Sequence, residues 1–196
     1  MGRVSLKDVR QKEIIMAFYT VAKKIGLENA SLAKVADHMN INPSLIAHYF
    51  KTREALLAGL ISFTLERYRD IYNIDGQNYS TVNQLKRLVN NLFSRKWDKL
   101  VDDGVFYSCY ALTYRNRKVR KDFMALHNSL RVMLVEALRK AKRHGVITIP
   151  NEKQTADVIF VLVEGAYYYL GMVDSKADYD RKIGIYKKQA LRLLGI

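Results

Sequence analysis

Hydrophobic residues recur every three or four positions along most of this chain, which is the spacing of one face of an α-helix. The first run lies within residues 14–25, and Gly26 follows it in a position typical of a helix end. Further runs continue to residue 194 and are separated by short polar segments. The pattern predicts an all-α fold of about nine helices.

Polar residues stand where the second, third and fourth helices would begin. Ser31 and Asn42 are suitable N-caps, and Pro43 occupies a first helical position, where a missing N–H has no cost. Thr52 is a suitable cap for a longer helix that runs to about residue 71. Two short helices within residues 32–50 therefore precede a long one.

Beyond a polar loop at residues 73–80, the apolar stripes predict helices over residues 82–97, 105–114, 119–141, 156–173 and 183–194. The segment 156–173 is apolar almost all the way round, so this helix must be buried on two sides. In so short a chain, we interpret one of those sides as another subunit. Glu164 in its centre and three consecutive tyrosines argue against a membrane span.

The composition limits the partners and the chemistry. The formal net charge is +14, but residues 1–54 hold only nine basic and five acidic residues, so charge alone does not locate a binding face. The single cysteine, Cys109, and an N-terminus without an apolar signal core indicate a cytoplasmic protein. No catalytic motif or metal-ligand spacing occurs, so we expect neither an enzyme nor a cofactor.

The segment SLAKVADHMNINPSLIAHYF, residues 31–50, predicts a helix-turn-helix, whose second helix enters the DNA major groove. Its apolar residues would hold the two helices together. The residues predicted to face outward and read base edges are Pro43, Ser44, Ala47 and His48. Phosphate contacts are expected from Lys51, Arg53 and the hydroxyl of Tyr49, and from the helix N-termini at Ser31 and Asn42. Tyr49 as a core residue remains an equal alternative.

This segment resembles the DNA-binding signature of the tetracycline-repressor (TetR) family. The matching features are an N-capping Ser31, the Val35-Ala36 pair, an apolar turn residue Ile41, the pair Tyr49-Phe50 and the helix start Arg53-Glu54-Ala55-Leu56. Residues 46–50 are also similar to the branch of choline-responsive repressors. The chain departs from the family at Asn40 and Ser44, where Gly is frequent, and at Ala47, where many members have a DNA-contacting Tyr.

The resemblance implies an N-terminal DNA-binding domain, residues 1–52, and a helical ligand-binding and dimerisation domain, residues 53–196. It also implies a homodimer formed by the last two helices and an inducer pocket among the helices between. Aromatic rings with a carboxylate suit an organic cation. The candidate ligand-binding residues are Trp97, Phe106, Tyr110, Tyr114, Glu164 and Tyr168. The alternative is that these rings fill the core and the dimer interface.

Two functions are consistent with these features. The first is a repressor that a small-molecule inducer of unknown identity releases from a palindromic double-stranded DNA operator. The second is a helical protein that binds DNA without sequence preference, or that carries a small molecule.

Overall fold

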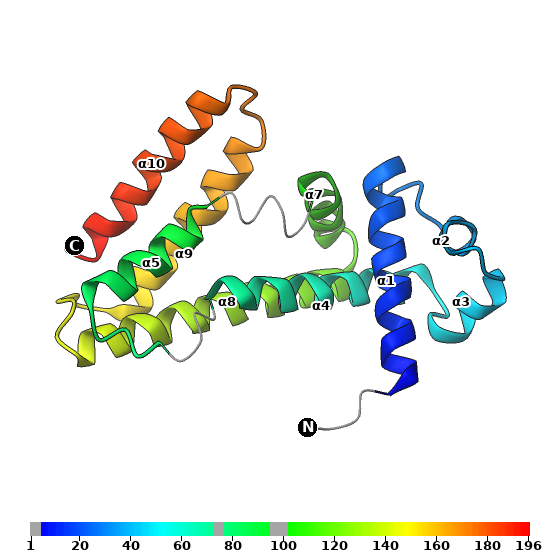
Figure 1. Ribbon diagram of the computed structural model, residues 1–196, viewed down its shortest axis with the longest axis horizontal. Helices are drawn as coiled ribbons and strands as arrows, with labels where there is room; N and C mark the ends of the chain where they lie inside the picture. Colours follow the sequence, from blue (N-terminus) through cyan, green and yellow to red (C-terminus); the bar gives the residue numbers. More distant parts are fainter. Residues whose placement is uncertain (1–4, 73–76, 95–101) are drawn as a thin grey trace. The chain divides into compact units, whose positions relative to one another are not determined.

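The computed structural model describes residues 5–72, 77–94 and 102–196, with the side chains of residues 65–72 excepted (Figure 1). Within these residues it contains nine α-helices and one short 3₁₀ helix, and no strand. The prediction of an all-α fold is confirmed. The elements are α1 (Leu6–Ile25), α2 (Leu32–Met39), α3 (Pro43–Tyr49), α4 (Arg53–Tyr72), α5 (Val82–Leu92), α7 (Asp103–Ala111), η1 (Leu112–Tyr114), α8 (Arg117–Arg143), α9 (Glu152–Leu170) and α10 (Lys176–Leu193).

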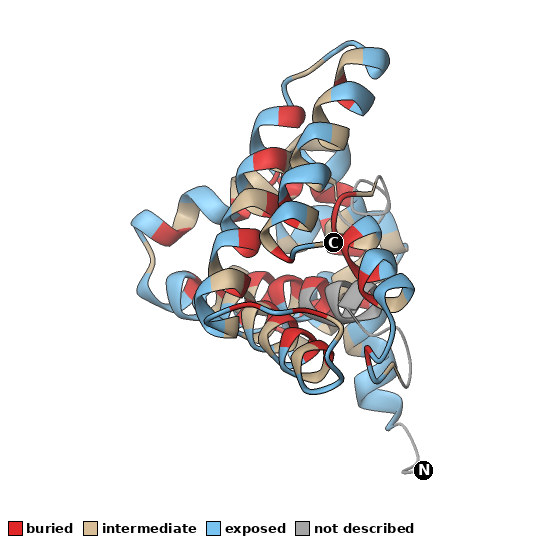
Figure 2. Cartoon of the chain, turned by 90° about the vertical axis from the view of Figure 1, so that its left-hand side faces the viewer, coloured by how far each residue is buried: buried red, intermediate tan, exposed pale blue. Residues whose placement is uncertain are grey.

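The chain divides into two compact units, and two of the boundaries between them fall inside helices α4 and α8. The first unit takes in Met1–Glu66 and Leu100–Leu126, and the second takes in Arg67–Lys99 and His127–Ile196. The first unit therefore extends past residue 52, where the sequence predicted a domain boundary, and includes α7 and the start of α8. In both units the buried positions lie on the inward faces of the helices (Figure 2).

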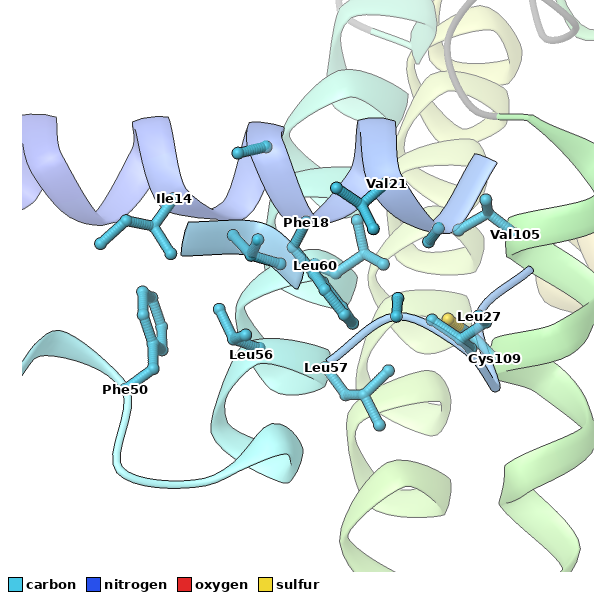
Figure 3. Close-up of a cluster of buried hydrophobic side chains, with 14 of the residues drawn as sticks. Ile14, Phe18, Val21, Leu27, Phe50, Leu56, Leu57, Leu60, Val105 and Cys109 are labelled. Carbon is cyan, nitrogen blue, oxygen red and sulfur yellow. The ribbon is translucent and has the colours of Figure 1, made fainter. Parts of the chain in front are cut away.

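The core of the first unit joins α1 to the short helices α2 and α3 and also to α4 and α7. Ile14 and Phe18 of α1 are fully buried and pack in one cluster with residues of the other helices. Figure 3 shows part of this cluster. The further members labelled there are Val21, Leu27, Phe50, Leu56, Leu57, Leu60, Val105 and Cys109. Its compact packing gives the N-terminal helices a fixed support.

The second unit packs α10 against α9 and α5. Leucines of α5 and α8 are almost wholly buried, and two ion pairs tie α8 to the start of α9. Arg131 Nε donates to Asp157 at 2.9 Å, and Lys142 Nζ lies 2.9 Å from Glu152 Oε1. None of the helices described in the structure has the length and apolar content to cross a membrane.

Helix α5 ends earlier than the apolar stripe predicted. It stops at Leu92, where the hydroxyl of Tyr167 on α9 lies 2.9 Å from the Leu92 carbonyl oxygen and 3.0 Å from that of Ser94. The hydroxyl thus offers a donor to carbonyl groups at the helix end, and the helix does not need to continue to satisfy them. Residue 97, the predicted end, lies outside the described residues.

Helix α10 begins earlier than predicted, at Lys176. Ser175 is its N-cap and accepts a hydrogen bond from the backbone N–H of Asp178 at 3.3 Å. The first turns of α10 are mostly polar, so hydrophobic periodicity did not reveal them.

Candidate nucleic-acid interface

Local hydrogen bonds set the path of the chain from α2 to α3. Ser31 accepts from the backbone N–H of Lys34 at 3.3 Å, as its predicted capping position requires. Asn40 ends α2 in the left-handed conformation, with φ 58° and ψ 41°. Asn tolerates this region better than most residues, so the turn forms here without a glycine. The backbone N–H of Ile41 then donates to the carbonyl oxygen of Ala36 at 3.0 Å and closes the turn.

Helix α3 turns one face into the core and the other outward. Ile46 is fully buried, together with Val35 and Ala36 of α2. Ser44, Ala47 and His48 are exposed, as are Asn42 and Pro43 at the start of the helix. The residues predicted to read bases therefore lie together on one accessible face. Because they are small apart from His48, α3 can approach base edges closely.

Four of the predicted contact residues interact with one another in two pairs. The side-chain oxygen of Asn42 accepts from the backbone N–H of Ser44 at 2.9 Å and from its hydroxyl at 2.8 Å. The rings of His48 and Tyr49 meet edge to face, with centroids 5.1 Å apart. Tyr49 is half-buried against the core cluster, so it is not the wholly buried core residue of the second alternative.

The two basic residues after α3 have different surroundings. Lys51 is exposed and suited to meet a phosphate. Arg53 is half-buried, and its guanidinium group donates to the carbonyl oxygens of Ala30 at 3.2 Å and Leu27 at 2.6 Å. The sequence analysis missed this role of Arg53, because no local pattern links residues so far apart in the chain.

Comparison with known proteins identifies the family. A family model described as "Tetracyclin repressor-like, C-terminal domain" matches residues 80–196, which is more than half of the 196-residue chain. This chain belongs to the TetR family. The family model covers the part of the chain that the N-terminal motif does not, so the two observations are independent.

Individual TetR-family relatives are distant. The HTH-type transcriptional regulator BetI of Serratia proteamaculans is 23% identical over 88 residues, 45% of this chain and 44% of that protein. The match thus spans less than half of the curated relative. A TetR transcription regulator from Haloarcula marismortui has a similar fold, with a TM-score of 0.81, 16% identity and coverage of 95% of this chain and 97% of that chain.

A third TetR-like fold is a transcriptional regulator from Saccharomonospora viridis, solved in complex with choline. It has a TM-score of 0.72 and 13% identity, and the match covers 92% of this chain and 94% of that one. At these identities the structural matches show the fold alone.

The predicted ligand-binding residues of this TetR-family chain are divided between its two units. In the first unit, the rings of Phe106 and Tyr110 both meet Phe123 edge to face, at centroid distances of 5.6 Å and 5.7 Å. Tyr114 is 71% exposed beside Tyr110. Glu164 and Tyr168 belong to the second unit. Trp97 lies outside the described residues.

A small apolar cavity of about 10 Å³ lies within the first unit. It is no larger than about one water molecule, and of the predicted residues only Phe106 lines it. Cys109 also lines it, and burial raises the pKa of this thiol to about 12, so Cys109 packs as a small apolar residue. Thr64, which no sequence pattern indicated, also lines this cavity, and its hydroxyl donates to the Leu60 carbonyl oxygen at 2.9 Å.

In the second unit, Glu164 faces His127 of α8, which the sequence analysis also missed. His127 Nε2 lies 3.9 Å from Glu164 Oε2, and the His127 ring meets that of Phe160 at 5.5 Å. Burial raises the pKa of the Glu164 carboxyl to about 7. Burial and, second, the charge of Arg131 lower the pKa of His127. Both side chains are therefore shifted toward their neutral forms.

Proposed function

We propose that this protein is a cytoplasmic transcriptional repressor that binds double-stranded DNA as a homodimer and is released by a small molecule. The observation that carries the proposal is the exposed face of α3, held on a buried core by the left-handed turn at Asn40. Residues 1–52 would read DNA, and residues 53–196 would bind the inducer and form the dimer.

Each exposed residue of α3 has a role suited to its chemistry. Ser44 and His48 would donate or accept hydrogen bonds at base edges, and Ala47 would contact a thymine methyl group. Lys51, the Tyr49 hydroxyl and the helix N-termini at Ser31 and Asn42 would contact phosphates.

The dimer would form through α9 and α10. Val158, Val161 and Tyr168 are exposed on one stripe of α9, with Met172 directly after the helix. On α10, Ile185 is exposed as well. A Cβ added at Gly165 or Gly184 would meet nothing within 4 Å, so these positions leave room for another helix. Apolar stripes of this kind commonly become buried in a subunit interface.

Inducer release would follow from a shift between two conformations of the dimer. One conformation holds the two recognition helices about 34–36 Å apart, which matches successive major grooves. A ligand that binds the other conformation more tightly shifts the population away from DNA. The carboxylate of Glu164 in the second unit favours a cation, and the Saccharomonospora viridis regulator with this fold was solved in complex with choline.

The alternative is binding to DNA without sequence preference, which the net charge of +14 favours. A titration of the purified protein separates the two, using duplexes from its own upstream region, scrambled duplexes and a series of salt concentrations. We expect binding in multiples of a dimer to one palindromic duplex, far tighter than to scrambled DNA at the same salt. Equal and steeply salt-dependent binding to every duplex would support the alternative.

Two variants assign the roles. We expect His48→Ala to reduce the preference for the operator, by about 1–3 kcal/mol if it removes a good base contact. Lys51→Gln should instead weaken binding to all duplexes. It should reduce the slope of log affinity against log salt by about 2, since a dimer would lose two phosphate contacts.

A further inference from the structure

Arg53 joins the beginning of α4 to the loop between α1 and α2. Its Nε donates to the Ala30 carbonyl at 3.2 Å, and a terminal nitrogen donates to the Leu27 carbonyl at 2.6 Å. Leu27 and Ala30 are 3% and 1% exposed, so their carbonyl groups have little access to water. The Leu27 carbonyl also accepts from the backbone N–H of Ala30 at 3.3 Å, so without Arg53 it would keep one donor. A charged donor makes a strong hydrogen bond, and a buried carbonyl group that loses such a bond is destabilised.

These bonds enclose the DNA-reading segment. Ala30 directly precedes Ser31, the N-cap of α2, and Arg53 is the first residue of α4. The chain between them consists of α2, the turn, α3 and residues 50–52. The hydrogen bond from Arg53 to Ala30 therefore joins the two ends of the helix-turn-helix segment. One of these ends is the start of α4, which supports the segment.

We propose that Arg53 is a positioning residue for operator recognition: its guanidinium group fixes α2 and α3 against α4 and is not primarily a phosphate contact. The proposal rests on the function proposed above, because it concerns how the reading helix is oriented. Without the two bonds, the helix-turn-helix occupies several orientations on α4. The apparent operator affinity then falls in proportion to the population of the competent orientation.

The geometry requires arginine and not only positive charge. A guanidinium group is planar and presents several donors in a fixed fork, so one side chain reaches two carbonyl groups. A lysine ammonium group is a single point donor on a flexible stem. The burial of this side chain also separates it from Lys51, which is exposed two residues earlier.

Two charge-conserving variants test the proposal: Arg53→Lys and, as the control, Lys118→Arg. Lys118 is exposed on α8 and is not among the residues assigned to DNA contact. We expect Arg53→Lys to weaken binding to the tightest palindromic duplex about tenfold, as a competent population near one tenth would do. The salt slope and the binding of scrambled duplexes should stay as in the wild type. Lys118→Arg should leave operator affinity, scrambled-duplex affinity and salt slope unchanged. Wild-type operator affinity in Arg53→Lys would overturn the proposal, because it would show that charge alone suffices.

Amide hydrogen exchange of the DNA-free protein gives a second, independent measurement. We expect Arg53→Lys to accelerate exchange at the start of α2, around residues 31–35, and Lys118→Arg to leave it unchanged. Unchanged exchange in Arg53→Lys would also overturn the proposal. Partial unfolding of the variant would weaken its affinity for operator and scrambled duplexes by the same factor. The ratio of the two affinities therefore still reports the positioning of the helix-turn-helix. If the wild type prefers no duplex, the proposed function fails, while the exchange data still decide whether Arg53 holds α2.

Discussion

Glu164 and His127 form a pair of titratable side chains between α9 and α8 whose charges are both disfavoured. The carboxyl and imidazole groups lie 3.9 Å apart beside the ring of Phe160. Burial raises the pKa of Glu164 to about 7 and lowers that of His127. A carboxyl group poised near neutral pH responds strongly to a nearby charge, which suits the proposed role of Glu164 toward a cation.

We expect Glu164→Gln to stabilise the protein at neutral and higher pH. The raised pKa means that the folded state holds the proton more tightly than the unfolded state, whose value is near 4.5. The contribution of this carboxyl to stability therefore falls as the pH rises from about 4.5 through 7. Because 38% of the side chain is exposed, we expect a gain of only about 1 kcal/mol at pH 8.

Urea unfolding at fixed protein concentration between pH 5 and pH 8 measures this difference. His127 acts in the opposite direction, since its lowered pKa reduces stability as the pH falls below 6.5, but it does so in both proteins. If the difference in unfolding free energy between variant and wild type stays constant over this pH range, the raised pKa of Glu164 is contradicted.

At the scale of single elements, α3 depends on its cap as much as on its buried face. It has only seven residues, and Ile46 is its one wholly buried residue. The Asn42 side chain accepts the hydrogen bond from the Ser44 N–H that would otherwise lack a helical partner. Short helices are marginal without such contacts, so the cap also stabilises the surface that would read DNA.

Substitutions of Asn42 separate capping from contact with DNA. We expect Asn42→Ala to cost about 1 kcal/mol of stability, because the cap is lost. Asn42→Asp keeps the cap, so stability should be close to that of the wild type, but a negative charge near the phosphates should weaken operator binding. Asn42→Ser, a neutral cap, is the matched control. Urea unfolding and operator titration measure the two effects, and equal operator affinity for the Asp and Ser variants would exclude a position near phosphate.

At the scale of the whole molecule, the exposed apolar stripe of α9 marks the surface proposed for dimerisation. Ile159 and Val163 face the core of the second unit, while Val158 and Val161 are exposed on the same helix. This division explains why the sequence of α9 is apolar almost all round. One face is covered within the chain, and the other is available for a partner subunit.

We expect Val161→Glu to convert the dimer to monomers and to abolish tight operator binding. Val161 is 66% exposed in the single chain, so the fold should tolerate the charge. In the dimer the same charge would be buried without a partner, which should weaken association at least about a hundredfold. Val132→Glu is the control, because Val132 is 60% exposed on α8. Analytical ultracentrifugation measures the mass; a dimeric Val161→Glu variant would place the interface elsewhere.

Sequence alone was sufficient where neighbouring residues determine the structure. The caps at Ser31 and Asn42 and the turn at Asn40 depend on residues within five positions of one another, and the outward face of α3 follows from helical periodicity. Such short-range hydrogen bonds and helical periodicity are legible in the residue order. The family signature lies in the same segment, and the TetR assignment from it is confirmed.

Tertiary structure alone decided the features that join distant parts of the chain. Arg53 binds carbonyl groups of Leu27 and Ala30, Tyr167 reaches the end of α5, and Glu164 meets His127. The candidate ligand residues fell into two units for the same reason. Residue order records which side chains are apolar or charged, but it does not record which distant groups packing brings within hydrogen-bonding range. That pairing, and the pKa shifts that burial causes, exist only once the helices have packed.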